Sequence, residues 1–240
     1  MGPMHFANDY PNVEAFAANA VGLKGKIELI WQPIYDWNIY PTAGILNLPF
    51  FATAQGQGQS AQPIAAAAVK SPADTNLTQA GTLPAPQSFW CDGIEVQIDA
   101  GSTATANLFA NAVPTFFAAA EAAAISAPLN DWVVIARSGT LAFSIMQKNY
   151  YQDGPLYRFP QRAAARIDAG VANTSATTSE LGIAMPYSFG KPVRFIPGWG
   201  IKTTTNFGVT LSWPAVRATA SGFNARIGVF LNGWLFRAAQ

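Results

Sequence analysis

Apolar and polar side chains alternate along several short stretches of this chain, which is the pattern of half-buried β-strands. In the stretch DGIEVQID, the side chains of Ile94, Val96 and Ile98 are expected to face a core while the residues between them face outward. Residues 207–213 repeat the pattern. Roughly ten to twelve such segments, separated by turn residues, predict an all-β protein built as a sandwich or barrel.

The stretch FNARIGVFLNGWLFRAAQ predicts a β-hairpin. Ile227, Val229 and Leu231 share one face of its incoming strand. Asn232-Gly233 is the pair favoured in a type I′ turn, because both central residues of that turn need a positive φ. An exposed apolar strand pair would promote aggregation. We therefore expect this hairpin to be paired and covered, within the sheet or by a partner.

One alanine-rich helix is expected among the strands. Residues 114–126, PTFFAAAEAAAIS, have Thr115 as an N-terminal cap and Pro128 as a stop signal. The stretch that follows, WVVIARSGTLAFSIMQK, predicts a β-hairpin that turns near Ser138 and Gly139.

The chain divides into an N-terminal arm, residues 1–22, and a body, residues 23–240. In the arm, Val13 and Phe16 begin an apolar face at helical spacing, which predicts a short helix that needs a surface to lie on. That surface is the protein's own body, a neighbouring subunit or an underlying membrane. Within the body, residues 55–87 are rich in small and turn-forming residues and predict a long loop.

Composition adds one strong signal, which is the shortage of charge. Charged residues make up 11% of the chain and the formal net charge is +1, whereas about 25% charged residues is usual in soluble domains. A weakly charged surface costs little to desolvate and does little to keep molecules apart. We expect identical subunits to cover much of it. The alternative is a compositional bias towards alanine that has no role in assembly.

Candidate chemistry is sparse. The single histidine, His5, lies in the arm, which does not preorganise a catalytic site. The single cysteine, Cys91, lies in an apolar run and is expected to be a core residue. Glu28, Glu95 and Asp99 are expected to be solvated charges on outward strand faces. We therefore expect no enzymatic activity, no catalytic residue and no cofactor or transition metal, while oxygen ligands in the loops leave a Ca²⁺ site open.

Two further features are candidates for contacts with other molecules. Trp199, between two glycines, is a possible ligand-binding or interface aromatic. Arg158, Arg162 and Arg166 form a small basic cluster that suits an acidic neighbour or, more simply, a solvated face. A net charge of +1 does not predict sequence-specific binding of nucleic acid.

The segments GTLPAPQSFWCDGIEVQID, GTLAFSIMQKNYYQDGPLYRFP and ARIGVFLNGWLFRAAQ together resemble the jelly-roll major capsid proteins of tailless icosahedral phages, especially those with two jelly rolls. The resemblance implies a double jelly roll divided near residues 130–140, or a single jelly roll with long loops. Two rolls need about sixteen strands, more than the alternation predicts.

The resemblance also implies a function and a set of partners. The chain would be a major capsid subunit that forms homotrimers, which act as pseudo-hexagonal capsomers of an icosahedral shell. Other virion proteins, such as a vertex protein, and an internal membrane beneath the arm would be further partners. The protein would be made in the bacterial cytoplasm and reside in the virion. The alternative is a carbohydrate- or receptor-binding β-sandwich, such as a spike or lectin-like domain, in which Trp199 would stack on a sugar ring.

Overall fold

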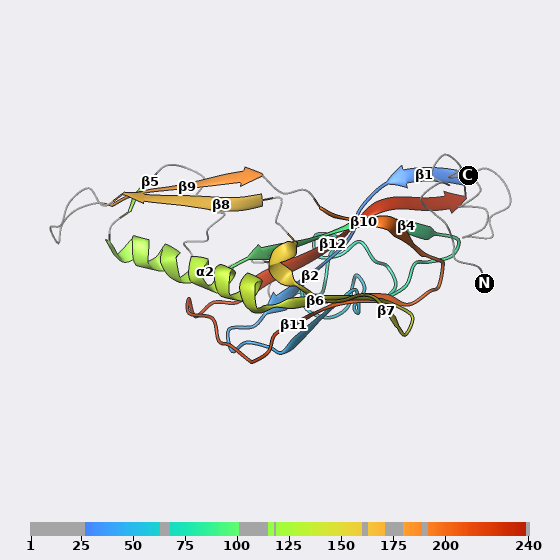
Figure 1. Ribbon diagram of the computed structural model, residues 1–240, viewed down its shortest axis with the longest axis horizontal. Coiled ribbons are helices and arrows are strands. Elements are labelled where there is room, and N and C mark those ends of the chain that lie inside the picture. Colours follow the sequence, from blue (N-terminus) through green and yellow to red (C-terminus); the bar gives the residue numbers. More distant parts are fainter. Residues whose placement is uncertain are drawn as a thin grey trace.

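The computed structural model describes residues 27–62, 68–100, 115–117, 119–159, 163–170, 180–188 and 192–238. Most of this part of the chain is β-strand, in two facing antiparallel sheets with one long helix at one end (Figure 1). The predicted all-β sandwich is therefore confirmed. The arm, with its predicted helix, Val13 and Phe16, lies outside the described residues.

The larger sheet has five antiparallel strands. They are β1 (Ile27–Trp31), β2 (Ile34–Tyr40), β4 (Ser88–Asp99), β10 (Val193–Ile201) and β12 (Ala225–Ala238). The order across the sheet is β1–β12–β4–β10, and β2 also pairs with β12. β1 and β2 follow one another along the same edge of β12, since Trp31 pairs with Trp234 and Ile34 with Leu231.

The second sheet of the sandwich has four strands in the order β3–β11–β6–β7. They are β3 (Asn47–Phe50), β6 (Thr140–Ile145), β7 (Lys148–Pro155) and β11 (Phe207–Ser212). A short 3₁₀ helix, η2 (Leu156–Arg158), follows β7. The residues of β11 pair with β3 on one side and with β6 on the other.

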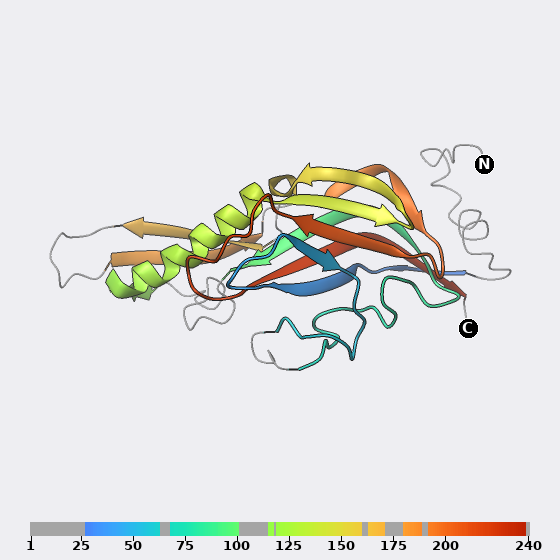
Figure 2. The ribbon, with the colours of Figure 1, turned by 90° about the horizontal axis from the view of Figure 1, so that it is seen from below.

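A smaller layer extends from one end of the sandwich (Figures 1 and 2). It contains α2 (Ala119–Ser138) and a three-stranded sheet of β5 (Thr115–Phe117), β8 (Ala163–Gly170) and β9 (Glu180–Ser188). β5 and α2 belong to the connection between β4 and β6, whereas β8 and β9 belong to the connection between β7 and β10. Two insertions far apart in the sequence therefore meet in one sheet.

The inner faces of the two large sheets form the core, and the predicted alternation is confirmed there. Ile94, Val96 and Ile98 of β4 are all buried. The other predicted core residues that are buried are Leu141, Phe143, Ile145, Phe207, Val209, Leu211, Trp213, Ile227, Val229 and Leu231. Apolar residues at every second position thus place one face of each strand against the opposite sheet.

The predicted helix is present, but its predicted bounds were wrong. α2 begins at Ala119, continues through Pro128 and ends at Ser138. Thr115, predicted to cap the helix, lies in β5. Residues 132–138, predicted as a strand of a hairpin, form the last turns of the helix.

Packing explains why the helix extends beyond the proline. Trp132, Ile135 and Ala136, spaced three and four residues apart, pack against the core from one face of the helix. The indole Nε1 of Trp213 also donates a hydrogen bond of 3.1 Å to the carbonyl oxygen of Ile135. A short apolar run fits a strand or a buried helix equally well. These tertiary contacts favour the helix and offset the backbone hydrogen bond lost at Pro128.

The predicted terminal hairpin was wrong. Residues 225–238 form one continuous strand, β12. Asn232 and Gly233 lie at an irregularity where the register with β4 shifts, and Gly233 does not have the positive φ of a type I′ turn. A Cβ at Gly233 would collide with the carbonyl oxygen of Trp90 and would lie 2.9 Å from Cζ of Phe89. The glycine is needed here because two strands approach each other closely. In the sequence alone, such a glycine looks the same as the glycine of a turn.

Candidate functional site

Trp199, the predicted ligand or interface aromatic, lies half-buried on β10 at the edge of the core. Its ring stacks on Phe195, with centroids 3.8 Å apart, and on Phe143, with centroids 5.1 Å apart. The ring of Tyr150 lies 5.7 Å away. These contacts cover much of the indole, so Trp199 is a packing residue of the β7–β10 side of the sandwich and offers a ligand little of its ring face.

The predicted basic cluster is only partly described. Arg158 is the last residue of η2 and is exposed. Arg166 lies on β8, where it pairs in register with Met185 of β9. Arg162 lies outside the described residues. The two described arginines belong to different elements, and their common role remains a prediction.

Cys91 is a core residue, as predicted. Its side chain is fully buried on β4, and its thiol donates a hydrogen bond of 3.4 Å to the carbonyl oxygen of Gly93. Burial raises the pKa of the Cys91 thiol far above its usual value. The neutral thiol that results is neither a nucleophile nor a metal ligand at physiological pH.

The predicted acidic residues differ in their surroundings. Glu28 is exposed, as predicted, and accepts a hydrogen bond of 2.5 Å from Nε of Arg237, which lowers the pKa of its carboxyl group. Glu95 was wrongly predicted to be solvated, because its residue is only 4% exposed. It pairs across the sheet with Phe230, whose ring belongs to an aromatic cluster on this outer face.

That aromatic cluster was not predicted. The ring of Trp37 contacts Phe230 edge to face at 5.7 Å, and the guanidinium of Arg226 lies 3.8 Å from the Trp37 ring centre. Trp37 also covers Gly228, where a Cβ would lie 2.7 Å from the indole. The Trp37–Gly228 pair depends on the register of β2 and β12, which the sequence does not reveal.

The edge formed by β1 carries the clearest exposed apolar surface of the larger sheet. Trp31 is 50% exposed and Leu29 is 38% exposed. Trp31 packs edge to face on Trp234 of β12, with ring centres 5.0 Å apart. Large apolar side chains that are exposed next to one another are typical of surfaces that meet another macromolecule.

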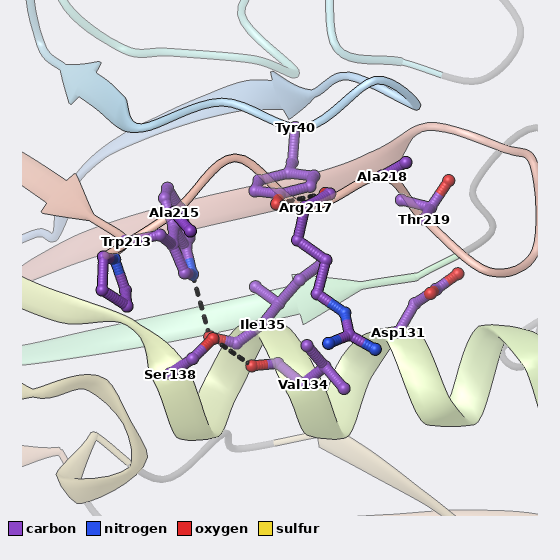
Figure 3. Close-up of a pocket in the computed structure, with 11 residues that line it drawn as sticks. Tyr40, Asp131, Val134, Ile135, Ser138, Trp213, Ala215, Arg217, Ala218 and Thr219 are labelled. Atoms are coloured by element: carbon purple, nitrogen blue, oxygen red, sulfur yellow. Dashed lines mark hydrogen bonds between the residues drawn. The ribbon is translucent and has the colours of Figure 1, made fainter.

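A pocket of about 180 Å³ lies between α2, β2 and the segment after β11 (Figure 3). Its polar groups are used to join these elements. The hydroxyl of Tyr40 donates a hydrogen bond of 2.8 Å to the carbonyl oxygen of Arg217. The carboxylate of Asp131 accepts hydrogen bonds from the amides of Ala220 at 2.6 Å and Ser221 at 2.9 Å.

The same pocket has no arrangement that suits catalysis by its lining residues. The hydroxyl of Ser138 donates to the carbonyl oxygen of Val134 within the helix, so it has no base to activate it. Asp131 is the single carboxylate of the lining, and both of its oxygens accept backbone amides. The exposed side chain of Arg217 extends across the pocket toward α2 (Figure 3). The residues that line this pocket connect the helix to the sandwich.

A buried polar network holds the long loop between β3 and β4 against β2. Nζ of Lys70 lies 2.6 Å from Oδ1 of Asp36, and both side chains are almost completely buried. Asp74, also buried, accepts hydrogen bonds from the hydroxyl of Ser60 and the amide of Ala61, each at 2.9 Å. The loop was predicted and is confirmed, but the charged network within it was not predicted.

No protein-family model, curated protein or solved structure matches this chain. In the described ranges, no three or more His, Cys, Asp or Glu side chains group as metal ligands would. Among the described residues, no helix combines the length and the apolar character needed to cross a membrane.

Proposed function

We propose that this chain is a single jelly roll and that it serves as a self-assembling subunit of a viral shell. The strand pairing carries the fold part of the proposal. With β1 and β2 counted as one interrupted strand, and β5, β8 and β9 of the small sheet left out, the two large sheets contain eight strands. The first pairs with the eighth, β2 with β12, and the second with the seventh, β3 with β11. The third pairs with the sixth, β4 with β10, and the fourth with the fifth, β6 with β7.

This nested pairing is what results when one long antiparallel hairpin is rolled into two facing sheets, which is the jelly-roll architecture. Strands from both sides of residues 130–140 pair within each sheet, β4 with β12 and β3 with β11. Two rolls divided near those residues would keep such pairs apart. The pairing therefore favours the single roll over the double roll.

Jelly rolls occur in viral capsids, in lectins and in cupins, so the fold leaves the function open. The low charge favours the shell subunit, because 11% charged residues leaves much surface that can be desolvated cheaply. The exposed Leu29 and Trp31 add an apolar edge that suits a subunit contact. The proposal assigns no reaction to the chain.

In this proposal the subunits form cyclic trimers, whose heterologous interfaces close on themselves. Further contacts join the trimers into an icosahedral phage shell with other virion proteins such as a vertex protein. Each stable interface would bury at least about 1,000 Å². The arm, with Val13 and Phe16, would contact the inner side of the shell or a membrane beneath it.

Light scattering during size-exclusion chromatography, followed by electron microscopy, tests the proposal. Trimers or closed shells are the expected result for the purified protein. A protein that stays monomeric at millimolar concentration would contradict it. Deletion of residues 1–22 tests the arm separately. Assembly with unchanged yield and stability would remove the arm from the proposal but leave the body's role intact.

The edge at β1 can be tested with a matched pair of variants. Trp31→Ser should lower the assembled fraction, because it removes an exposed ring from the proposed contact. Met146→Ser is the control, since Met146 is 71% exposed at the β6–β7 turn. Equal assembly of the two variants would argue against a contact at β1.

The carbohydrate- or receptor-binding alternative depends on an accessible aromatic ring. Trp199 suits that role poorly, because Phe195 and Phe143 stack on it. Quenching of tryptophan fluorescence by glycans, in a protein that remains monomeric, would favour the alternative over the shell subunit.

A further inference from the structure

Lys70 and Asp36 form a pair that is unusual in its isolation from water. Nζ of Lys70 lies 2.6 Å from Oδ1 of Asp36, and the two side chains are 2% and 0% exposed. Because Oδ1 is bonded to Cγ at about 1.2 Å, Nζ lies within about 4 Å of Cγ. That separation is close to the distance of about 3–3.5 Å from which reacting atoms form a bond.

The pair is held in place from both sides. The backbone amide of Lys70 donates to the carbonyl oxygen of Gln57 at 3.2 Å, and the carbonyl oxygen of Lys70 accepts from the amide of Gly56 at 2.8 Å. Asp36 lies within β2, whose neighbouring residues pair with β12. These backbone hydrogen bonds fix the main chain of both residues, so folding itself brings the two side chains together.

The two oxygens of the Asp36 carboxyl group have different partners. Oδ1 faces the amine of Lys70. Oδ2 accepts hydrogen bonds from the amide of Phe51 at 2.7 Å and from Nδ2 of Asn38 at 3.2 Å. Two donors on one oxygen are the arrangement that stabilises negative charge when a nucleophile adds to a carboxyl carbon.

Burial also disfavours the charged form of the Asp36 carboxyl group. Desolvation raises the pKa of Asp36 more than the ion pair with Lys70 lowers it. In a site of low dielectric, transfer of one proton from Nζ to Oδ1 turns the ion pair into a neutral amine and a neutral carboxylic acid. The neutral amine has the lone pair that an attack on Cγ requires.

We propose that Lys70 and Asp36 condense to form an intramolecular isopeptide bond. The lone pair of Nζ adds to Cγ, and the negative charge develops on Oδ2, where Phe51 and Asn38 donate. A proton from Nζ passes to the Oδ1 hydroxyl, the Cγ–Oδ1 bond breaks and one water leaves. The product is an amide between Nζ and Cγ, and the step needs no oxidant, reductant or external reactant.

The bond would tie the long loop covalently to β2. Residues 37–69 would then lie in a closed covalent ring that includes β3 and Ser60 of the loop's buried polar network. Such a ring restricts the unfolded chain, as a disulfide does, and would do so in a protein whose one cysteine cannot form an internal disulfide. This inference does not depend on the proposed shell function.

Mass spectrometry of the intact, denatured wild-type protein tests the bond directly. The expected mass is lower than the sequence mass by one water. Chymotrypsin cuts after the aromatic residues between positions 36 and 70, so the peptides that contain these two positions should remain joined. Trypsin should no longer cut after Lys70.

Lys70→Arg is the matched control, because arginine keeps the positive charge but stays protonated and cannot condense. It should restore the full mass. Water can also be lost at the Asp-Gly sequences 92–93 and 153–154, and that loss would persist in Lys70→Arg. A full-length mass in folded wild-type protein, or a water loss that Lys70→Arg retains, overturns the proposal. The wild-type measurement is decisive even if the variant does not fold.

Discussion

The sandwich and the loop between β3 and β4 are both well buried, but different forces hold them. The sandwich buries apolar side chains at alternate strand positions, such as Phe143 and Leu211. The loop instead buries Lys70, Asp74 and other polar side chains. A strand satisfies its backbone groups through the sheet, so its side chains are free to be apolar. A loop lacks that ladder and needs polar side chains as partners.

Asp74 shows this need most clearly. Its carboxylate accepts hydrogen bonds from the backbone amides of Ala61 and Ser71. In a strand, the carbonyl oxygens of a neighbouring strand would accept such bonds. The carbonyl oxygen of Asp74 accepts from the amide of Trp37, so the loop also extends the pairing of β2. The comparison teaches that the loop needs buried polar partners in addition to its apolar contacts, whereas the inner faces of the sheets are mainly apolar.

The largest expected effect is in the sandwich. Phe143→Ala should lower the free energy of unfolding by about 3–5 kcal/mol, because it leaves a cavity in a close-packed core. Thr210→Ala, on the outer face of β11, should change the free energy of unfolding by less than about 0.5 kcal/mol. Urea denaturation measures both. Similar losses for the two variants would contradict the assignment of inner and outer faces.

The loop should respond to loss of a charge rather than loss of volume. Lys70→Met should destabilise the fold by at least about 3 kcal/mol, because it removes the proposed bond to Asp36 and leaves the buried Asp36 carboxylate without its partner. Limited proteolysis should then cut the loop faster than in the wild type. The double variant Asp36→Leu/Lys70→Met should recover much of the loss. If the double variant is no better than the single one, an unpaired charge is not the cause.

Replacing one glycine in each region by alanine compares how tightly the sandwich and the loop are packed. Gly233→Ala should cost about 2–3 kcal/mol, because the new methyl group would collide with the backbone of β4. Gly56→Ala in the loop should cost only about 1 kcal/mol, since it adds backbone strain at a φ of 76° but meets no atom within 4 Å. Thermal denaturation distinguishes them. The reverse order would favour a turn at Gly233 over a strand.

The smallest expected effect is a change of stability with pH. Burial alone would raise the pKa of Asp74, but hydrogen bonds from Ser71, Ser60 and Ala61 outweigh it and lower the pKa. A lowered pKa in the folded state stabilises the fold at pH values above the usual aspartate pKa of about 3.9. That contribution is lost as the pH falls through the lowered value.

Asp74→Asn should therefore reduce the free energy of unfolding, measured by urea denaturation, by about 1–2 kcal/mol at pH 6, with a smaller difference from the wild type at pH 3. Asp36 is unchanged in Asp74→Asn, so any contribution it makes to the pH dependence, whether free or joined to Lys70, cancels in the comparison. A difference that stays constant between pH 6 and pH 3 would show that the hydrogen bonds of Asp74 do not depend on its charge.

Alternating patterns predicted the strands well where one face of a strand is buried. The inner residues of β4, β6 and β11 follow directly from the period of two in a pleated strand. The pattern failed for residues 132–138, because a short apolar run has no period that separates strand from helix. Of the candidate site residues, Cys91 was placed correctly and Glu95 was not.

Local composition by itself determined the β class, the long loop and the inner faces of the main strands, because each depends on neighbours in sequence. Tertiary structure alone decided which strands pair, that β12 continues through Gly233, and that Lys70 meets Asp36 across 34 positions of chain. These features join residues that are distant in sequence. Their energies come from contacts that exist only after the chain has folded, and no local pattern records them.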